Sequence, residues 1–142
     1  SGGAIKNTML NSNIKEALIL NGNSFIDINL QGFIDFHFKN SFENSICTTN
    51  KTNGPSHYYL NIEGTRLKEV LHSTSSKDDF IYAGLGIINV DVFNLTHLQS
   101  FSLSKEILPH LCDETLGLFK SEKTLYTIET EESYNQTIES LK

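Results

Sequence analysis

Apolar runs and polar breaks alternate along this chain and divide it into short predicted elements. An apolar run at residues 17–20 stops at the polar turn 21–24, and apolar side chains resume at residues 25–30. This pattern predicts a buried strand that ends in a tight turn. Because ligands and metals gather at the carboxyl ends of buried strands in open α/β sheets, the turn is the first candidate for a binding site.

Helical spacing and β-prone runs account for most of the remaining chain. Apolar residues at helical spacing predict a helix at residues 30–40, and a short helix follows the glycine-rich start. Ser102 is the expected N-cap of a helix through residue 111. Acidic residues after Thr130 open a last helix, to residue 141, without a full capping box. β-prone runs predict strands at residues 45–49, 57–62, 66–71, 81–89, 116–119 and 125–128, the last two joined by a turn.

Composition narrows the range of functions. A chain of 142 residues with 38% hydrophobic content has room for one domain with its own core. Eleven basic and 17 acidic residues give a net charge of −6 without a basic cluster, which argues against binding to nucleic acid or to an anionic membrane surface. No apolar run approaches the roughly 20 residues of a membrane helix, and no signal peptide is visible, so we expect a cytoplasmic protein. Cys47 and Cys112 lack zinc-site spacing and are expected to be reduced core thiols.

Two segments resemble the sugar-1-phosphate nucleotidyltransferases. That family has an apolar strand followed by Asn-Gly-Asp, a small residue, an aromatic residue and Asp, and here residues 17–27 read ALILNGNSFID. Residues 101–109, FSLSKEILP, are similar to the family's Phe-Ser-Leu-Glu-x-Asp-Leu-Leu-Pro helix. The likeness extends from Gly2 to about Ser140 and is nearest to the hexose- or heptose-1-phosphate guanylyltransferases. It implies a three-layer, Rossmann-like α/β sandwich in which residues 1–142 form a single, N-terminally truncated domain.

The resemblance also implies binding positions. The start of the chain matches the second half of the family's Gly-Thr-Gly-Gly-Ala loop, which contacts the nucleotide base, and a hairpin and a strand of the family touch the sugar. Tyr82 occupies the position of an asparagine in the family. Gly84 is also explained by close packing of backbones, without a ligand. The expected nucleotide-binding residues are Gly2, Gly3, Ala4 and Gly22, and the expected sugar-binding residues are Tyr58, Tyr82 and Gly84.

The charged groups of the family's active site are replaced. Two aspartates hold magnesium in the family, and Asn23 and Thr127 occupy their positions here. The hairpin lysine that meets the sugar phosphate becomes Ser73, and the family's glycine-rich phosphate loop, with its arginine and lysine, would precede Ser1. Neutral ligands do not offset the charge of Mg²⁺. We therefore assign no catalytic residue and expect weak or absent Mg²⁺ binding and near-zero activity of this chain alone.

These observations leave more than one function open. The family reaction converts a nucleoside triphosphate and a sugar 1-phosphate to a nucleotide sugar and pyrophosphate, and this chain would be a fragment or a decayed relative of such an enzyme. The alternative is a non-catalytic binding or scaffolding module in nucleotide-sugar or surface-polysaccharide metabolism, or an unrelated α/β domain. Expected partners are a nucleotide sugar or sugar phosphate. The family's first strand lies beside the one at residues 17–20, so we also expect a homo-oligomer or a complementing N-terminal segment.

Overall fold

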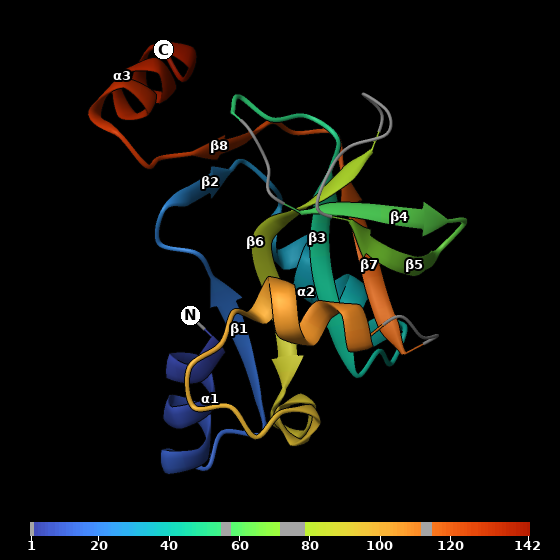
Figure 1. Cartoon of the computed structure of the whole chain (residues 1–142). Helices are drawn as coiled ribbons and strands as arrows, with labels where there is room; N and C mark the ends of the chain where they lie inside the picture. The colour runs from blue at the N-terminus through green and yellow to red at the C-terminus, as the bar shows by residue number, and fades with distance from the viewer. Residues whose placement is uncertain (1, 55–57, 72–78, 112–114) are drawn as a thin grey trace.

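The computed structural model describes residues 2–54, 58–71, 79–111 and 115–142 (Figure 1). Its helices are α1 (Gly2–Asn11), α2 (Leu30–Lys39) and α3 (Glu131–Ser140), and shorter helical turns are η1 (Val90–Leu95), η2 (Leu103–Ile107) and η3 (Leu108–His110). Its strands are β1 (Glu16–Leu20), β2 (Ser24–Ile26), β3 (Asn44–Thr49), β4 (Tyr59–Glu63), β5 (Arg66–Leu71), β6 (Phe80–Asn89), β7 (Leu116–Ser121) and β8 (Leu125–Thr127). No described helix is both long enough and apolar enough to cross a membrane.

A mixed six-stranded sheet forms the centre of the molecule. Its order is β5-β4-β6-β3-β7, and β1 pairs with the end of β6 beyond the point where β4 pairs. The β3–β7 pair is parallel and the other pairs are antiparallel. The remaining strands, β2 and β8, form a separate antiparallel ribbon. The prediction of a hairpin at residues 116–128 is therefore wrong, because β7 joins the main sheet whereas β8 joins the ribbon.

Two hydrophobic clusters lie on opposite faces of the sheet and make the three layers. On one face, Phe33 of α2 packs with Cys47 and with the odd-numbered residues of β6. On the other, Met9 of α1 packs with residues of η1, η2 and η3. In Figure 1, η2 and η3 lie in front of the sheet and α2 lies behind it. The predicted α/β sandwich is confirmed.

The position of each strand explains its burial. All six residues of β3 are buried because β3 lies between β6 and β7. In β1 only Ile19 is buried, and Leu20 is 63% exposed. The prediction of a strand there is confirmed, but the prediction that it is buried is wrong. Among the described strands β1 pairs only with β6, so half of its backbone groups have no strand partner there.

Two further predictions need correction. Residues 103–110 form a π turn and a 3₁₀ turn and not a regular α-helix, although Ser102 is the N-cap as predicted. Pro109 has no N–H to continue an α-helical ladder, which accounts for the change. A capping box is present at α3, because the Ser133 hydroxyl accepts from the Thr130 N–H (3.0 Å) and the Thr130 hydroxyl accepts from the Ser133 N–H (3.1 Å). Ser133 thus occupies the third helical position of the capping box, which is usually Glu or Gln.

Candidate functional site

The polar turn after β1 leads directly into the β2–β8 ribbon. The ribbon pairs Ser24 with Thr127, and the Ile128 N–H donates to the Asn23 carbonyl oxygen at 2.8 Å. Asn23 is exposed and Thr127 is half-buried. The structure thus pairs two segments that lie far apart in the sequence, with Asn23 opposite Ile128 and Thr127 opposite Ser24.

Residues 51–53 run beside β8, on the side away from β2, and complete this surface. The Leu125 N–H donates to the Lys51 carbonyl (2.8 Å), and the Asn53 N–H donates to the Leu125 carbonyl (3.1 Å). The Asn53 side-chain oxygen accepts from the Thr127 N–H at 3.1 Å. Asn53 therefore fixes the backbone next to Thr127. The local sequence of this segment, with its asparagines and Gly54, is typical of a loop, and nothing in it shows that the segment pairs with β8.

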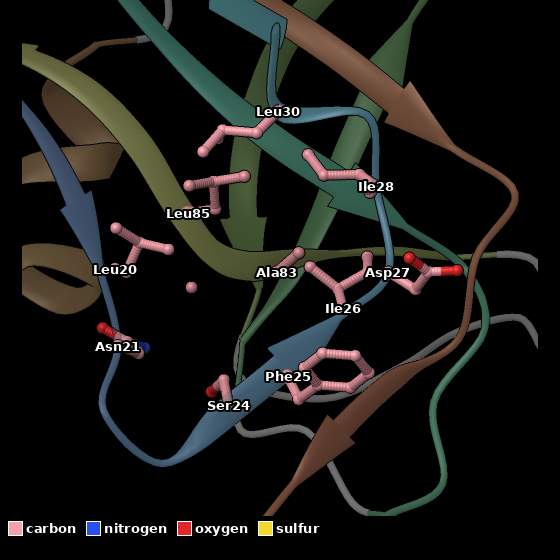
Figure 2. Close-up of a pocket in the computed structure, with 11 residues that line it drawn as sticks. Leu20, Asn21, Ser24, Phe25, Ile26, Asp27, Ile28, Leu30, Ala83 and Leu85 are labelled. Carbon is pink, nitrogen blue, oxygen red and sulfur yellow. The ribbon is translucent and has the colours of Figure 1, made fainter. Parts of the chain in front are cut away.

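An apolar pocket of about 300 Å³ opens between the end of β1, β2 and the middle of β6. Leu20, Leu85 and Ile26 face its interior, and the Asp27 carboxylate points away from it (Figure 2). Asn21 and Ser24 supply polar groups at the margin. Ligand pockets usually range from about 300 to 1,000 Å³, so this one has room for a single ring.

Gly84 shapes the wall of this apolar pocket. Its φ is +74°, and a Cβ on it would lie 2.9 Å from the Asn21 side-chain nitrogen. The Asn21 N–H also donates to the Gly84 carbonyl at 2.8 Å. Only glycine adopts this backbone conformation without strain while allowing such close approach. Gly84 has a packing role and also lines the pocket.

A second, polar pocket of about 320 Å³ lies between the ribbon and α3. Its wall contains Thr127, Asn53 and side chains from the first turns of α3. Two carboxylates, Glu129 and Glu132, and the hydroxyls of Thr130 and Ser133 also line it. Carboxylates and amide oxygens accept hydrogen bonds from ligand hydroxyls, whereas the carboxylates repel phosphate.

The predicted nucleotide-binding glycines lie on separate elements. Gly2 and Gly3 begin α1, where added Cβ atoms would lie 2.3 Å from the Phe101 ring and 2.1 Å from the Gln99 carbonyl oxygen. This close packing explains both glycines without a ligand. Ala4 is exposed beside them, and Gly22 has open space around it. In Figure 1 the start of α1 lies at the end of the sheet where β1 ends.

The two predicted sugar-binding tyrosines differ in their surroundings. Tyr58 is half-buried just before β4, whereas the Tyr82 hydroxyl is buried in β6 without a hydrogen-bond partner in the described part of the chain. Burial raises the pKa of Tyr82, and the nearby Cys47 adds to this effect. An unpaired buried hydroxyl is unfavourable by about 1–3 kcal/mol, so Tyr82 is held there by the packing of its ring. Ser73 lies outside the described residues.

The groups near Asn23 and Thr127 do not fit Mg²⁺. The pair supplies an amide and a hydroxyl, and the nearby Asp27 carboxylate contacts the Lys123 ammonium at 3.3 Å. Residues 2–54, 58–71, 79–111 and 115–142 contain no cluster of three His, Cys, Asp or Glu that could hold a metal ion. Magnesium prefers carboxylates that neutralise its charge.

Comparisons with known proteins identify the fold. No protein-family model matches the chain, and no curated protein matches it either. Among solved structures, HddC from Yersinia pseudotuberculosis superposes with a TM-score of 0.77 at 17% identity and covers the whole chain. The same protein complexed with GMP-PN gives 0.77 at 18%.

Two nucleotidyltransferases also match. A candidate glucose-1-phosphate thymidylyltransferase from Bacillus anthracis, solved with sucrose, gives a TM-score of 0.70 at 10% identity and is matched by 94% of this chain. The inositol-1-phosphate CTP transferase from T. maritima gives 0.66 at 11% identity and is matched by 96%. The chain spans 62%, 56% and 60% of HddC and these two proteins. It has the mixed α/β fold of the sugar-phosphate nucleotidyltransferases.

Proposed function

We propose that this chain is a sugar-1-phosphate nucleotidyltransferase-like domain that binds a nucleotide sugar or sugar phosphate and has no turnover of its own. The observation that carries the proposal is that Asn23 and Thr127, both neutral, lie on the paired segments of the β2–β8 ribbon. An amide and a hydroxyl can exchange hydrogen bonds with sugar hydroxyls and phosphate oxygens. They carry no charge with which to hold a divalent cation.

The two pockets suit different parts of such a ligand. The apolar pocket suits the flat face of one ring, and its small volume excludes a whole nucleotide sugar. The polar pocket suits sugar hydroxyls, because its carboxylates and amides are acceptors that match hydroxyl donors. The exposed Asn23 amide, next to Ser24 of the apolar pocket in sequence, is a donor available to phosphate.

Absence of turnover follows from the charges of the described residues around the ribbon. The family reaction is attack of a sugar-phosphate oxygen on the α-phosphorus, and it depends on positive charge that stabilises the transition state. The Lys123 ammonium already contacts Asp27, and the Lys51 ammonium contacts Glu122 at 3.0 Å. Neither Asn23 nor Thr127 can supply the missing charge through a metal.

The alternative is a non-catalytic binding or scaffolding module in nucleotide-sugar or surface-polysaccharide metabolism. The same neutral pair favours it, because a binding module needs hydrogen bonds but no metal. A complementing polypeptide would restore turnover to a nucleotidyltransferase-like domain, whereas it would not restore turnover to a binding or scaffolding module. HddC, a fold neighbour, has been solved with GMP-PN, so guanosine nucleotides are the first probes.

Titration calorimetry with GDP-mannose, GMP and mannose 1-phosphate tests binding. We expect saturable binding of GDP-mannose with a Kd on the order of 1 mM and no pyrophosphate release from GTP and mannose 1-phosphate. Thr127→Val removes one hydroxyl and should weaken binding severalfold. The matched control is Thr8→Val, on the exposed side of α1, which should bind like the unmodified chain.

A different result would contradict each part of the proposal. Absence of saturable heat for all three ligands would refute binding. Pyrophosphate release above the rate without protein would refute the claim of inactivity. Equal weakening by Thr8→Val and Thr127→Val would place the ligand elsewhere on the molecule.

A further inference from the structure

Two asparagines of this chain are followed directly by glycine: the first pair is Asn21 with Gly22, and the second pair is Asn53 with Gly54. An asparagine can react with the peptide bond that follows it, because the main-chain nitrogen of the next residue reaches its side-chain carbonyl carbon. A side chain on the next residue hinders this approach, and glycine has none. The two pairs are therefore alike in sequence, and a difference in their reactivity has to come from the fold.

Hydrogen bonds hold both residues of the second pair. The Asn53 side-chain oxygen accepts from the Thr127 N–H at 3.1 Å. The Gly54 N–H donates to the Thr52 hydroxyl oxygen at 3.2 Å. The reaction removes the proton of the Gly54 nitrogen and rotates the Asn53 carboxamide towards that nitrogen, so it works against both bonds. The fold therefore protects this pair.

The first pair lies in the turn between β1 and β2 and is held less firmly. The turn is closed by the Ser24 N–H, which donates to the Asn21 carbonyl oxygen at 3.4 Å, beyond the usual range of about 2.7–3.2 Å. Neither the Asn21 carboxamide nor the Gly22 N–H forms a hydrogen bond with the residues that the structure describes. A Cβ on Gly22 would meet no atom within 4 Å. The carboxamide can therefore rotate towards the Gly22 nitrogen without losing a hydrogen bond.

We propose that the first pair is a site of spontaneous deamidation, whereas the fold protects the second pair from the same reaction. The Gly22 nitrogen gives its proton to water and attacks Cγ of Asn21, and the new C–N bond closes a cyclic imide. The bond between Cγ and Nδ2 breaks, and Nδ2 takes up a proton and leaves as ammonia. No oxidant or reductant takes part.

Water then opens the imide ring and leaves a carboxylate. Cleavage between the ring nitrogen and Cγ gives aspartate in place of Asn21. Cleavage between the ring nitrogen and the main-chain carbonyl carbon gives isoaspartate, in which the main chain runs through Cγ and is one carbon longer. Both products carry a negative charge at neutral pH that asparagine lacks.

The position of Asn21 links this modification to ligand binding. Asn21 lies at the margin of the apolar pocket, in the same turn as Asn23 (Figure 2). A carboxylate there repels phosphate. Modified chains should therefore bind a nucleotide sugar more weakly, an effect that rests on the proposed function, whereas the modification itself does not.

Peptide mapping by mass spectrometry follows both pairs during incubation in mildly alkaline buffer. Asn21 should convert on the order of tenfold faster than Asn53, because two hydrogen bonds of modest net strength oppose reaction of the second pair. The same chain unfolded in guanidinium chloride is the control, since it lacks these bonds and both pairs should convert at similar rates. Released ammonia, measured in parallel, checks the leaving group.

Two substitutions separate the contributions of the neighbouring groups. Gly22→Ala places a methyl group on the attacking residue and should slow conversion of Asn21 severalfold, without changing that of Asn53. Thr52→Val removes the hydroxyl that holds the Gly54 N–H but keeps the shape of the side chain, and should speed conversion of Asn53. Circular dichroism shows that each variant is folded before the rates are compared.

Equal rates for Asn21 and Asn53 in the folded chain would overturn the proposal. An unchanged rate at Asn53 in Thr52→Val would do the same for the protection of the second pair. Asn21 that stays unmodified in the folded chain, while it converts in guanidinium chloride, would show that the turn is not a deamidation site. All of these rates are measured without a nucleotide or sugar, so their outcome is independent of whether the chain binds such a ligand.

Discussion

The central strand β3 and the β2–β8 ribbon depend on different forces. Strand β3 is buried along its whole length, and its side chains pack against both hydrophobic clusters. The ribbon has strands of three residues, and Phe25 on it is 40% exposed. Only Leu125, which is buried in one hydrophobic cluster, and Ile26, which packs against it, anchor the two strands to the core; otherwise backbone hydrogen bonds hold the ribbon, and these do not depend on side-chain identity. Polar side chains there can therefore change while the fold remains.

Truncating Phe33 of α2, which packs against β3, and Phe25 of the ribbon should show the largest difference in stability between the two regions. Phe33 is fully buried, with its ring 5.5 Å from that of Phe119, whereas Phe25 lies on the ribbon, 6.3 Å from Tyr126. Phe33→Ala should lower the free energy of unfolding by about 3–5 kcal/mol, because a cavity remains in the core. Phe25→Ala should lower it by less than about 1 kcal/mol. Urea denaturation monitored by circular dichroism gives both values, and equal losses would contradict the distinction.

Substitutions of two glycines near the turn after β1 compare the sheet with the turn that leads to the ribbon. Gly84→Ala should destabilise the chain by about 1–2 kcal/mol, because its φ of +74° is unfavourable for an L side chain and Asn21 must move. Gly22→Ala meets open space and should change the free energy of unfolding by no more than about 0.5 kcal/mol. Thermal denaturation of the two variants side by side is the check. A larger effect at Gly22 would show that the turn is constrained in a way that the contacts do not reveal.

Burial of Cys47 in the sheet also predicts that the free energy of unfolding depends on pH in the alkaline range. Burial raises the pKa of the Cys47 thiol from its ordinary value of 9.0 to about 12. The unfolded chain therefore loses this proton first, and the free energy of unfolding should fall as pH rises from 9 towards 12. The slope from one such thiol is at most about 1.4 kcal/mol per pH unit. Denaturation at a series of pH values should show a smaller slope for Cys47→Ala, and an unchanged slope would contradict the assignment.

Local patterns predicted the elements whose residues follow one regular period. Phe33 and His37 recur at helical spacing in α2 and are both buried, and the apolar run of β6 became the longest strand. The pattern failed where a single side chain decides the geometry. Pro109 interrupts a helix that the apolar residues alone would continue, and a serine hydroxyl completes the capping box of α3.

The candidate site could be predicted only in part. The pairing of the segments that carry Asn23 and Thr127 was suggested by the order of segments shared with a known family, since nothing local to either residue indicates the other. Asn53 was missed, because its hydrogen bond to Thr127 depends on how a loop pairs with β8. The exposure of β1 was missed, because an apolar run in sequence does not show which of its side chains are covered, whereas the expectation of a further partner beside it came from the resemblance alone.

Restoring both carboxylates tests most directly whether Asn23 and Thr127 form one site. Asn23→Asp with Thr127→Asp places one charge just before β2 and one at the end of β8, and we expect weak Mn²⁺ or Mg²⁺ binding, with a Kd on the order of 1 mM, seen by water relaxation or calorimetry. Each single variant should bind severalfold less tightly, as should the control Asn7→Asp with Thr8→Asp on α1, which carries the same added charge. Pyrophosphate release should stay at background, because positioning of the triphosphate, on the order of 7–11 kcal/mol where fully realised, is still missing. Metal binding no tighter than in the control, or turnover by the double variant alone, would contradict the account.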